Sequence, residues 1–374
     1  MAARPVVGPD NDDTPPRRAP PASPWRLRPT LFGWLVLAEG LGLVSTIAWQ
    51  QRPLGAVLGV GLLAAVACNA VLAPRRLRAL RAEHLPGAPP IAGEDAMLSA
   101  RLIAAGGSAP FTLEAVEPTR QRREVVGHVP GLGGTPARLA WSVRFPRRGA
   151  VTLAPLVAST NQPFGLVAAW RAISPPGEAV VLPPVGLLRR DLRERLDRWL
   201  ESLAAGEDRG DDEIAHLRPY RPGDAPHGIH WRASARARAL LVAERHAPAA
   251  RHLALVVDTD RTLVTPRRLD RLASVAATFV DHLGRRGWDL SLHGRFAPAG
   301  IVGDRARLLE TLALLMPEDP TIPLGECLPP GRPCVVLTSR PLAVDATAGG
   351  PRPLVLSLDD CDALVRLPRR ARLG

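Results

Sequence analysis

The chain has 374 residues, 46% of them hydrophobic, which is enough for one large domain or two to three ordinary domains with packed cores. Its 48 basic residues, all arginine, outnumber 36 acidic residues and give a formal net charge of +12. The arginines are spread along the chain and aromatic residues make up only 4%, whereas nucleic-acid-binding surfaces cluster charge and interleave aromatic rings. This composition argues against nucleic-acid binding. The four cysteines have neither C-x-x-C nor zinc-ligand spacing, which argues against a disulfide framework or a zinc site.

Two apolar stretches near the N-terminus predict a membrane anchor. Residues 1–29 are rich in Pro, Arg and Asp and are predicted to be a disordered cytoplasmic tail. Residues 31–49 and 54–73 are each about long enough to cross a bilayer core of roughly 30 Å, and only four residues separate them. We therefore predict a transmembrane helical hairpin over residues 30–74.

Arginines flank this hairpin on its outer sides and are almost missing from its link. The flanking residues are Arg17, Arg18, Arg26 and Arg28 before the first stretch and Arg75, Arg76, Arg78 and Arg81 after the second; Arg52 alone lies between. Positive charge marks the cytoplasmic ends of membrane spans. The pattern predicts two membrane spans, with both termini and the soluble domains in the cytoplasm.

One ionisable residue, Glu39, falls inside the first apolar stretch. A charged group at that depth is costly and usually faces a partner or a protein interior. Two interpretations are open: Glu39 contacts another helix or subunit, or its carboxyl group is protonated or reaches the interface. Asn69 could pair with Glu39 only if the register of the hairpin slipped.

The middle of the chain has the pattern of short β-strands. After an arginine- and proline-rich linker at 75–95, residues 96–185 contain short apolar runs separated by glycine and proline breaks. Strands at this spacing indicate a small β-sandwich-like domain. The runs cover residues 97–104, 111–116, 137–145, 151–157, 164–173 and 179–182.

The C-terminal third alternates between strand and helix patterns. Leucines at three-to-four spacing predict an amphipathic helix over residues 187–204, at the start of a segment 186–247 that joins the two domains. Residues 248–374 then predict a doubly wound α/β domain with a mostly parallel sheet. The expected strands are 252–257, 288–293, 333–338 and 353–358, with helices at 266–287 and 304–315.

The first strand of this domain leads into an acidic loop. Asp258, Asp260 and Thr262 alternate there, and three oxygen ligands on one loop could approach a magnesium-like ion. The alternative is that these side chains cap the loop and the following helix. Arg261 opposes a bound cation, and the strand at 333–338 is followed by no acid. The sequence therefore predicts no cofactor beyond, at most, a degenerate divalent-cation site.

Residues 217–244 concentrate the only Tyr, one Trp, two His and several Arg between turn signals. Asp224, His227 and His230 could form a hydrolytic or metal centre, but no recognisable nucleophile elbow accompanies them and Ser234 has only proximity in its favour. The other interpretation is a structural or partner-docking segment, in which Asp224 bonds turn amides and Trp231 packs into a core. The arginines would then form a charge network or a basic face for an acidic partner. They are Arg221, Arg232, Arg236 and Arg238.

This segment resembles the signature of a bacterial family, the domain of unknown function numbered fifty-eight. The signature reads Arg-x-Tyr-x-Pro-Gly-Asp, a short spacer, then Ile-x-Trp-x-x-Ser-Ala-Arg. His227 stands where the family usually has Arg, and Arg147–Gly149 and Pro163–Leu166 are similar to a second family phrase. The matching residues are Arg218, Tyr220, Pro222, Gly223, Asp224, Ile229, Trp231, Ser234, Ala235 and Arg236.

The resemblance implies two N-terminal spans in a bacterial inner membrane, a von Willebrand factor A-like C-terminal domain and no established catalytic activity. Its metal site normally reads Asp-x-Ser-x-Ser with a Thr and an Asp from other loops. Here the pattern is Asp258-x-Asp260-x-Thr262 without the further Asp, which indicates a degenerate site. Family members are typically encoded beside MoxR-type AAA+ ATPases and are thought to act with them.

Together these features predict a non-enzymatic, membrane-anchored cytoplasmic interaction or scaffold protein that acts with a MoxR-type AAA+ ATPase. The signature residues would form its docking surface. The alternative is a membrane-tethered metal-dependent hydrolase that uses Asp224, His227 and His230. The sequence does not indicate an oligomeric state.

Overall fold

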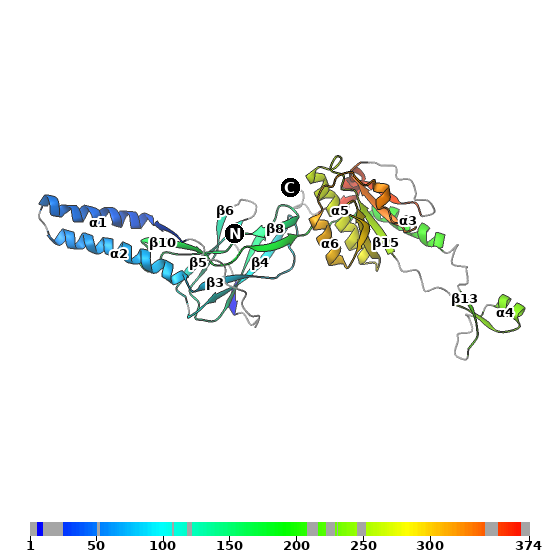
Figure 1. Cartoon of the computed structure of the whole chain (residues 1–374), viewed down its shortest axis with the longest axis horizontal. Helices are drawn as coiled ribbons and strands as arrows, with labels where there is room; N and C mark the ends of the chain where they lie inside the picture. The colour runs from blue at the N-terminus through cyan, green and yellow to red at the C-terminus, as the bar shows by residue number, and fades with distance from the viewer. Residues whose placement is uncertain are drawn as a thin grey trace. The chain divides into compact units, whose positions relative to one another are not determined.

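The computed structural model of the chain divides into two compact units, Met1–Leu182 with Leu373–Gly374, and Pro183–Arg372. Figure 1 shows the helices and sheets of both. The structure describes residues 6–9, 25–50, 53–106, 108–117, 122–207, 216–221, 229, 231–244, 252–340 and 351–367.

The first unit contains two antiparallel sheets and a separate two-stranded ribbon. The four-stranded sheet has the order β1-β7-β4-β3, the five-stranded sheet has the order β2-β10-β9-β5-β6, and β8 pairs with β11. The strands of the first sheet are β1 (Val6–Pro9), β3 (Leu80–Leu85), β4 (Asp95–Ala104) and β7 (Ala137–Arg144). Those of the second are β2 (Arg26–Pro29), β5 (Phe111–Glu117), β6 (Arg122–Val129), β9 (Val157–Thr160) and β10 (Val167–Ala172), and the ribbon is β8 (Gly149–Leu153) with β11 (Gly177–Val181).

The two larger sheets share one hydrophobic core. Side chains of β7 alternate between buried and accessible positions, as a strand with one covered face requires. The buried cluster joins Leu102 and Leu139 of one sheet to Leu113 and Ala158 of the other. Leu77, at the end of helix α2, belongs to the same cluster. The core therefore ties the base of that helix to the β-structure.

Parts of the predicted tail and linker are strands. β1 pairs with β7 and β2 pairs with β10, each at the edge of its sheet, and β3 lies inside the predicted linker. Edge pairing is made by backbone groups, so a short segment can join a sheet without the apolar run that a sequence pattern requires. This is why β1, β2 and the polar β6 were missing from the prediction.

Two apolar helices, α1 (Leu31–Gln50) and α2 (Pro53–Leu77), lie side by side in Figure 1. Their backbones approach closely, because a Cβ added to Gly59 would lie 2.6 Å from the Gly40 carbonyl oxygen. Glu39 is exposed on α1. Asn69 of α2 is fully buried; its side chain accepts hydrogen bonds from Phe164 N (3.2 Å) and Leu166 N (3.1 Å) and donates one to the Val167 carbonyl (3.1 Å).

The predicted transmembrane hairpin is wrong in its span count. Among the described residues, only the helical stretch Leu54–Leu77 is long and apolar enough to cross a membrane. The described apolar part of α1, Leu31–Ser45, is shorter. The described residues therefore contain one candidate span in place of the two that were predicted.

The second unit is built on a five-stranded sheet of order β17-β16-β15-β18-β19. Neighbouring strands are parallel except β16 and β17, which form an antiparallel pair. The strands are β15 (His252–Val257), β16 (Asp289–Gly294), β17 (Ala297–Val302), β18 (Cys334–Thr338) and β19 (Leu354–Ser357). The helices are α3 (Arg190–Glu207), α5 (Pro266–Gly284), α6 (Arg305–Leu314) and α7 (Leu358–Leu364), and the short strands β12 (Leu187–Leu188) and β20 (Val365–Arg366) pair with each other.

Local sequence signals explain where three of these helices begin. The side chains of Thr265, Asp304 and Ser357 each accept a hydrogen bond from a backbone N–H in the first turn of the helix that follows. Such residues satisfy donors that a helix N-terminus otherwise leaves unpaired. Thr265 is followed by Pro266, whose fixed φ suits the first helical position.

The sheet is not doubly wound, contrary to prediction. Helix α5 packs against both α6 and α7, and α3 packs against α7, which places the described helices together on one face. The opposite face, with Val256 and Val336, packs against the short 3-10 helix η2 (Leu324–Cys327). A doubly wound fold needs helices on both faces. The unpredicted β17 returns beside β16 as a hairpin, and the segment around η2 covers the second face in place of a crossover helix.

Candidate functional site

The segment that carries the signature folds into a small strand–helix–strand module. Strand β13 (His216–Pro219) pairs antiparallel with β14 (Leu241–Glu244), and helix α4 (Trp231–Ala237) precedes β14. Ile229 forms an isolated bridge with Val242, and Tyr220 N donates to the Leu240 carbonyl at 2.8 Å. The module therefore brings the two halves of the signature together through backbone pairing.

Ser234 closes this module. Its hydroxyl oxygen accepts a hydrogen bond from Leu241 N at 2.9 Å and contacts the Leu241 carbonyl at 3.4 Å. Ser234 is buried. The chain turns from α4 toward β14 at Arg238, which has a positive φ of 49°. The hydroxyl group thus fastens α4 to the start of β14. This contact has a structural role, because it satisfies a backbone N–H at the start of β14.

The outer side of α4 carries an aromatic ring and positive charge. Trp231 is 65% exposed, which differs from the packed position that the structural interpretation gave it. Arg232 and Arg236 are exposed and four residues apart, so they lie on one face of the helix. Like charges at this spacing repel each other, and an acidic surface would relieve that repulsion. We call Trp231, Arg232 and Arg236 the α4 face.

Several predicted site residues cannot be placed in this geometry. Pro222, Gly223, Asp224, His227 and His230 lie outside the described residues. The hydrolase alternative, which rests on three of them, stays a prediction. Arg218 is placed by its backbone in β13, and Tyr220 is half-buried.

The predicted acidic loop at the end of β15 closes around an arginine. Asp258 and Asp260 are both buried, and each forms an ion pair with Arg295, whose side chain is 8% exposed. The Arg295–Asp260 contact is 3.3 Å, and Arg295 Nε also donates to the Ile322 carbonyl at 2.9 Å. Arg295 follows β16, the parallel neighbour of β15, so the carboxyl ends of the two strands bring the three side chains together.

Hydrogen bonds within the loop complete the cluster. Thr262 donates to Asp260 Oδ1 from both its backbone N (2.9 Å) and its hydroxyl group (2.6 Å). Burial acts to raise the pKa of Asp260, but the Thr262 hydrogen bonds and the charge of Arg295 outweigh it, and the pKa lies below its ordinary value. Asp260 is therefore held as a carboxylate by its own loop and by Arg295.

This arrangement does not fit a divalent cation. The Arg295 guanidinium lies against both carboxylates that would bind the ion, and a second positive charge there would be repelled. The residues that the structure describes include no group of three or more His, Cys, Asp or Glu placed to share a metal. Arg295 was not among the predicted site residues. Its position directly after β16, the parallel neighbour of β15, could have indicated that it lies near the acidic loop.

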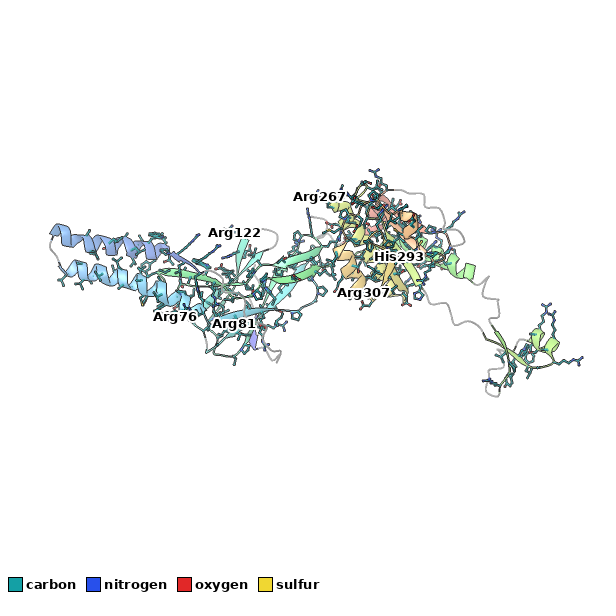
Figure 2. The ribbon with its side chains drawn as sticks, viewed as in Figure 1. Arg76, Arg81, Arg122, Arg267, His293 and Arg307 are labelled. Carbon is teal, nitrogen blue, oxygen red and sulfur yellow. The ribbon has the colours of Figure 1, made fainter. Side chains whose placement is uncertain are left out.

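A second polar pair missed by the sequence analysis lies on β16. His293 Nε2 and Ser291 Oγ are hydrogen-bonded at 2.9 Å, and both residues are buried (Figure 2 labels His293). Burial lowers the pKa of His293, which favours a neutral ring. Gly300 of β17 covers that ring, because a Cβ there would lie 2.2 Å from His293 Cε1. The His293 ring thus packs against the edge strand β17, while its hydrogen bond to Ser291 stays within β16.

Comparisons with known proteins give no family assignment. No protein-family model matches the chain, and no curated protein matches it in sequence. The function must therefore be argued from the geometry and from the signature residues.

Proposed function

We propose that this protein is a membrane-anchored interaction protein whose α4 face docks an acidic surface of a MoxR-type AAA+ ATPase. Helix α2 is the anchor, and the β-structure of the first unit together with the second unit forms the soluble part. The carrying observation is the exposed Trp231 on the same short helix as two exposed arginines that share one face. Aromatic and arginine side chains are enriched among residues that dominate binding energy at protein interfaces.

Helix α2 supports the membrane anchor. The stretch Leu54–Leu77 is long and apolar enough by length and composition to cross a membrane, and its last turns, from Asn69 to Leu77, pack against the β-structure. Several of its large apolar side chains are exposed, among them Leu54, Val57 and Leu58. Buried in lipid, this surface would be removed from water, which is favourable in proportion to its area.

Charge at the base of α2 supports a cytoplasmic position for the soluble part. Arg75 and Arg76 lie in the last turn of α2, and Arg81 follows on β3. Figure 2 shows Arg76 and Arg81 where the helix meets the β-structure. Because arginine is enriched on the cytoplasmic side of membrane spans, we propose that the β-structure of the first unit lies in the cytoplasm.

The identity of the partner rests on the signature alone. The residues from Arg218 to Arg236 resemble those of family fifty-eight, whose members are thought to act with MoxR-type ATPases. The closed acidic loop fits the same proposal, because a cluster occupied by Arg295 is not free to capture a ligand through a metal ion. Contacts of the α4 face would then carry the interaction.

Docking can be tested by reversing charge on the α4 face. The full chain, with Arg232→Glu and Arg236→Glu together, is compared with the parent in co-purification from native membranes. The matched control is Arg267→Glu with Arg307→Glu, which reverses two exposed arginines elsewhere (labelled in Figure 2). We expect a MoxR-type ATPase to co-purify with the parent and the control, and to be lost with the α4 variant. Equal recovery with all three proteins would rule out the α4 face.

Membrane insertion can be tested on Cys68. This cysteine is exposed on α2, while the other three are buried, and burial raises the pKa of Cys334 to about 11. A membrane-impermeant maleimide should leave Cys68 unlabelled in membranes and label it in detergent. An Arg76→Cys control should react in inside-out vesicles and not in intact cells. Rapid labelling of Cys68 in both membrane orientations would contradict the anchor.

A further inference from the structure

The β-structure of the first unit contains a hollow between its two sheets. Its volume is about 70 Å³. Leu98 of β4 and Trp141 of β7 line it from one sheet, Ala115 of β5 lines it from the other, and Leu153 of β8 closes one side. Leu98 and Trp141 are directly opposite each other in the β4–β7 pairing, so their side chains share the inner face. Thr152, also in the lining, is exposed, so the hollow reaches the surface at β8.

Two polar atoms in this apolar lining have no protein partner among the described residues. Trp141 is 9% exposed, and its indole Nε1–H is buried without a hydrogen-bond acceptor. His84 of β3 also lines the hollow, and its Nε2 is buried without a partner. The two rings are 6.3 Å apart, centroid to centroid. A buried donor of this kind costs free energy unless something bonds it.

Another tryptophan of the same unit shows the usual outcome. Trp170 Nε1 donates to Glu114 Oε1 at 3.1 Å. Trp170 therefore has an acceptor within the protein, whereas the indole N–H of Trp141 has none among the described residues. The hollow that Trp141 lines is the space into which an acceptor could fit.

The chemistry of the hollow selects a neutral ligand. Burial lowers the pKa of His84, which favours a neutral ring at neutral pH. The lining offers apolar contact, one N–H donor and one imidazole nitrogen. In size the hollow is about half of an engineered cavity of roughly 150 Å³ that binds benzene, so it suits a group of a few heavy atoms.

We propose that this hollow is a binding site for a small neutral molecule, or the end of a longer one, that has an alkyl body and one oxygen acceptor. The acceptor oxygen takes the Trp141 indole hydrogen, and the alkyl part packs against Leu98, Ala115 and Leu153. Entry is past Thr152. This site is separate from the α4 face, and neither proposal depends on the other.

The probe is butan-2-one, which has a short alkyl body and one carbonyl oxygen. The full chain in lipid nanodiscs, with ¹⁵N-labelled tryptophan, is titrated while the indole N–H resonances are recorded. Trp141→Phe identifies the resonance of Trp141, and Trp170→Phe identifies the control. We expect a saturable shift of the Trp141 resonance, with half-saturation in the millimolar range set by the small size of the probe. The Trp170 resonance should not move.

A second variant removes the space but keeps the indole. Ala115→Leu places extra carbons in the hollow, and circular dichroism checks that the protein keeps its fold. Half-saturation should rise at least tenfold, or the saturable shift should vanish. A Trp141 resonance that does not move, that moves linearly like Trp170, or that moves equally in the folded Ala115→Leu variant would overturn the proposal. A long-lived water bonded to Trp141 and retained throughout the titration would also overturn it.

Discussion

The acidic loop and the α4 face use similar charged residues in opposite ways. In the loop, Asp258 and Asp260 are buried and the protein supplies its own cation, Arg295. On α4, Arg232 and Arg236 are exposed beside Trp231, and they lie together on one face. Burial decides the difference, because an unpaired charge is costly inside the protein and cheap in water. A charged motif therefore holds the fold together in one place and remains available for docking in the other.

Removing Arg295 should produce the largest effect. Arg295→Ala leaves two buried carboxylates without their cation, and we expect the free energy of unfolding of the second unit to fall by roughly 3–5 kcal/mol. Urea unfolding followed by tryptophan fluorescence measures the change. A variant with Arg295→Met, Asp258→Asn and Asp260→Asn together should recover much of the loss, since it removes the charges as well. A loss below about 1 kcal/mol for Arg295→Ala would mean that the cluster does not hold the fold.

The free energy of unfolding should depend on pH differently in the parent and in Arg295→Ala. The pKa of Asp260 in the folded protein lies below its ordinary value of 3.8, so its contribution is present above that value and is lost as pH falls through the lower, folded pKa. The parent should therefore lose stability below about pH 4. In Arg295→Ala, where protonation relieves buried charge, lowering the pH from 7 to 5 should narrow the gap to the parent. A gap that stays constant would argue against this electrostatic origin.

A smaller effect is expected inside the signature module. Ser234→Ala removes the acceptor of the partly buried Leu241 N–H, and we expect a local loss of roughly 1–2 kcal/mol. Hydrogen exchange at the Leu241 amide measures it. The control is Ser202→Ala on α3, where an exposed hydroxyl group donates to the Trp199 carbonyl at 2.6 Å. Unchanged protection of Leu241 would show that the strands alone hold the module.

The α4 face should matter least for stability. Trp231→Ala removes an exposed side chain, so we expect the free energy of unfolding to change by no more than about 0.5 kcal/mol. Co-purification of the ATPase should nevertheless be lost. Thermal unfolding and co-purification on the same preparation test both statements. If Trp231→Ala lowered the free energy of unfolding by several kcal/mol, Trp231 would be a packed residue. The α4 face would then contribute to stability as the acidic loop does.

The sequence patterns predicted individual elements better than their arrangement. The strand at 252–257 has the predicted limits, and the helix expected at 304–315 is present as Arg305–Leu314. β17 was missed because its residues are mostly accessible, as an edge strand allows, and so lack an apolar run. The prediction of a doubly wound sheet was wrong because β17 returns beside β16 as a hairpin and the segment around η2, not a crossover helix, covers the second face. Of the predicted pair of spans, the described residues contain one helix that is both long and apolar enough.

Asn69 shows how far a single residue can depart from a sequence-based expectation. It was considered as a partner for Glu39 within the helices, yet it bonds the backbone between Phe164 and Val167, nearly a hundred residues away. No local pattern predicts such a contact. The buried amide instead connects α2 to the turn before β10, which a hydropathy profile does not describe.

The sequence by itself determined the apolar character of α2, the alternation of strands and helices after residue 248, and the signature residues that resemble a known family. These features depend on neighbours within one or two turns of the chain, so local spacing encodes them. The tertiary structure decided which charges are neutralised. Arg295 reaches Asp258 and Asp260 only because two parallel strands end side by side, and Arg232 and Arg236 stay exposed because they lie on the side of α4 opposite the buried Ser234. Burial depends on residues that are distant in sequence, and for a charged residue burial decides between a structural and a binding role.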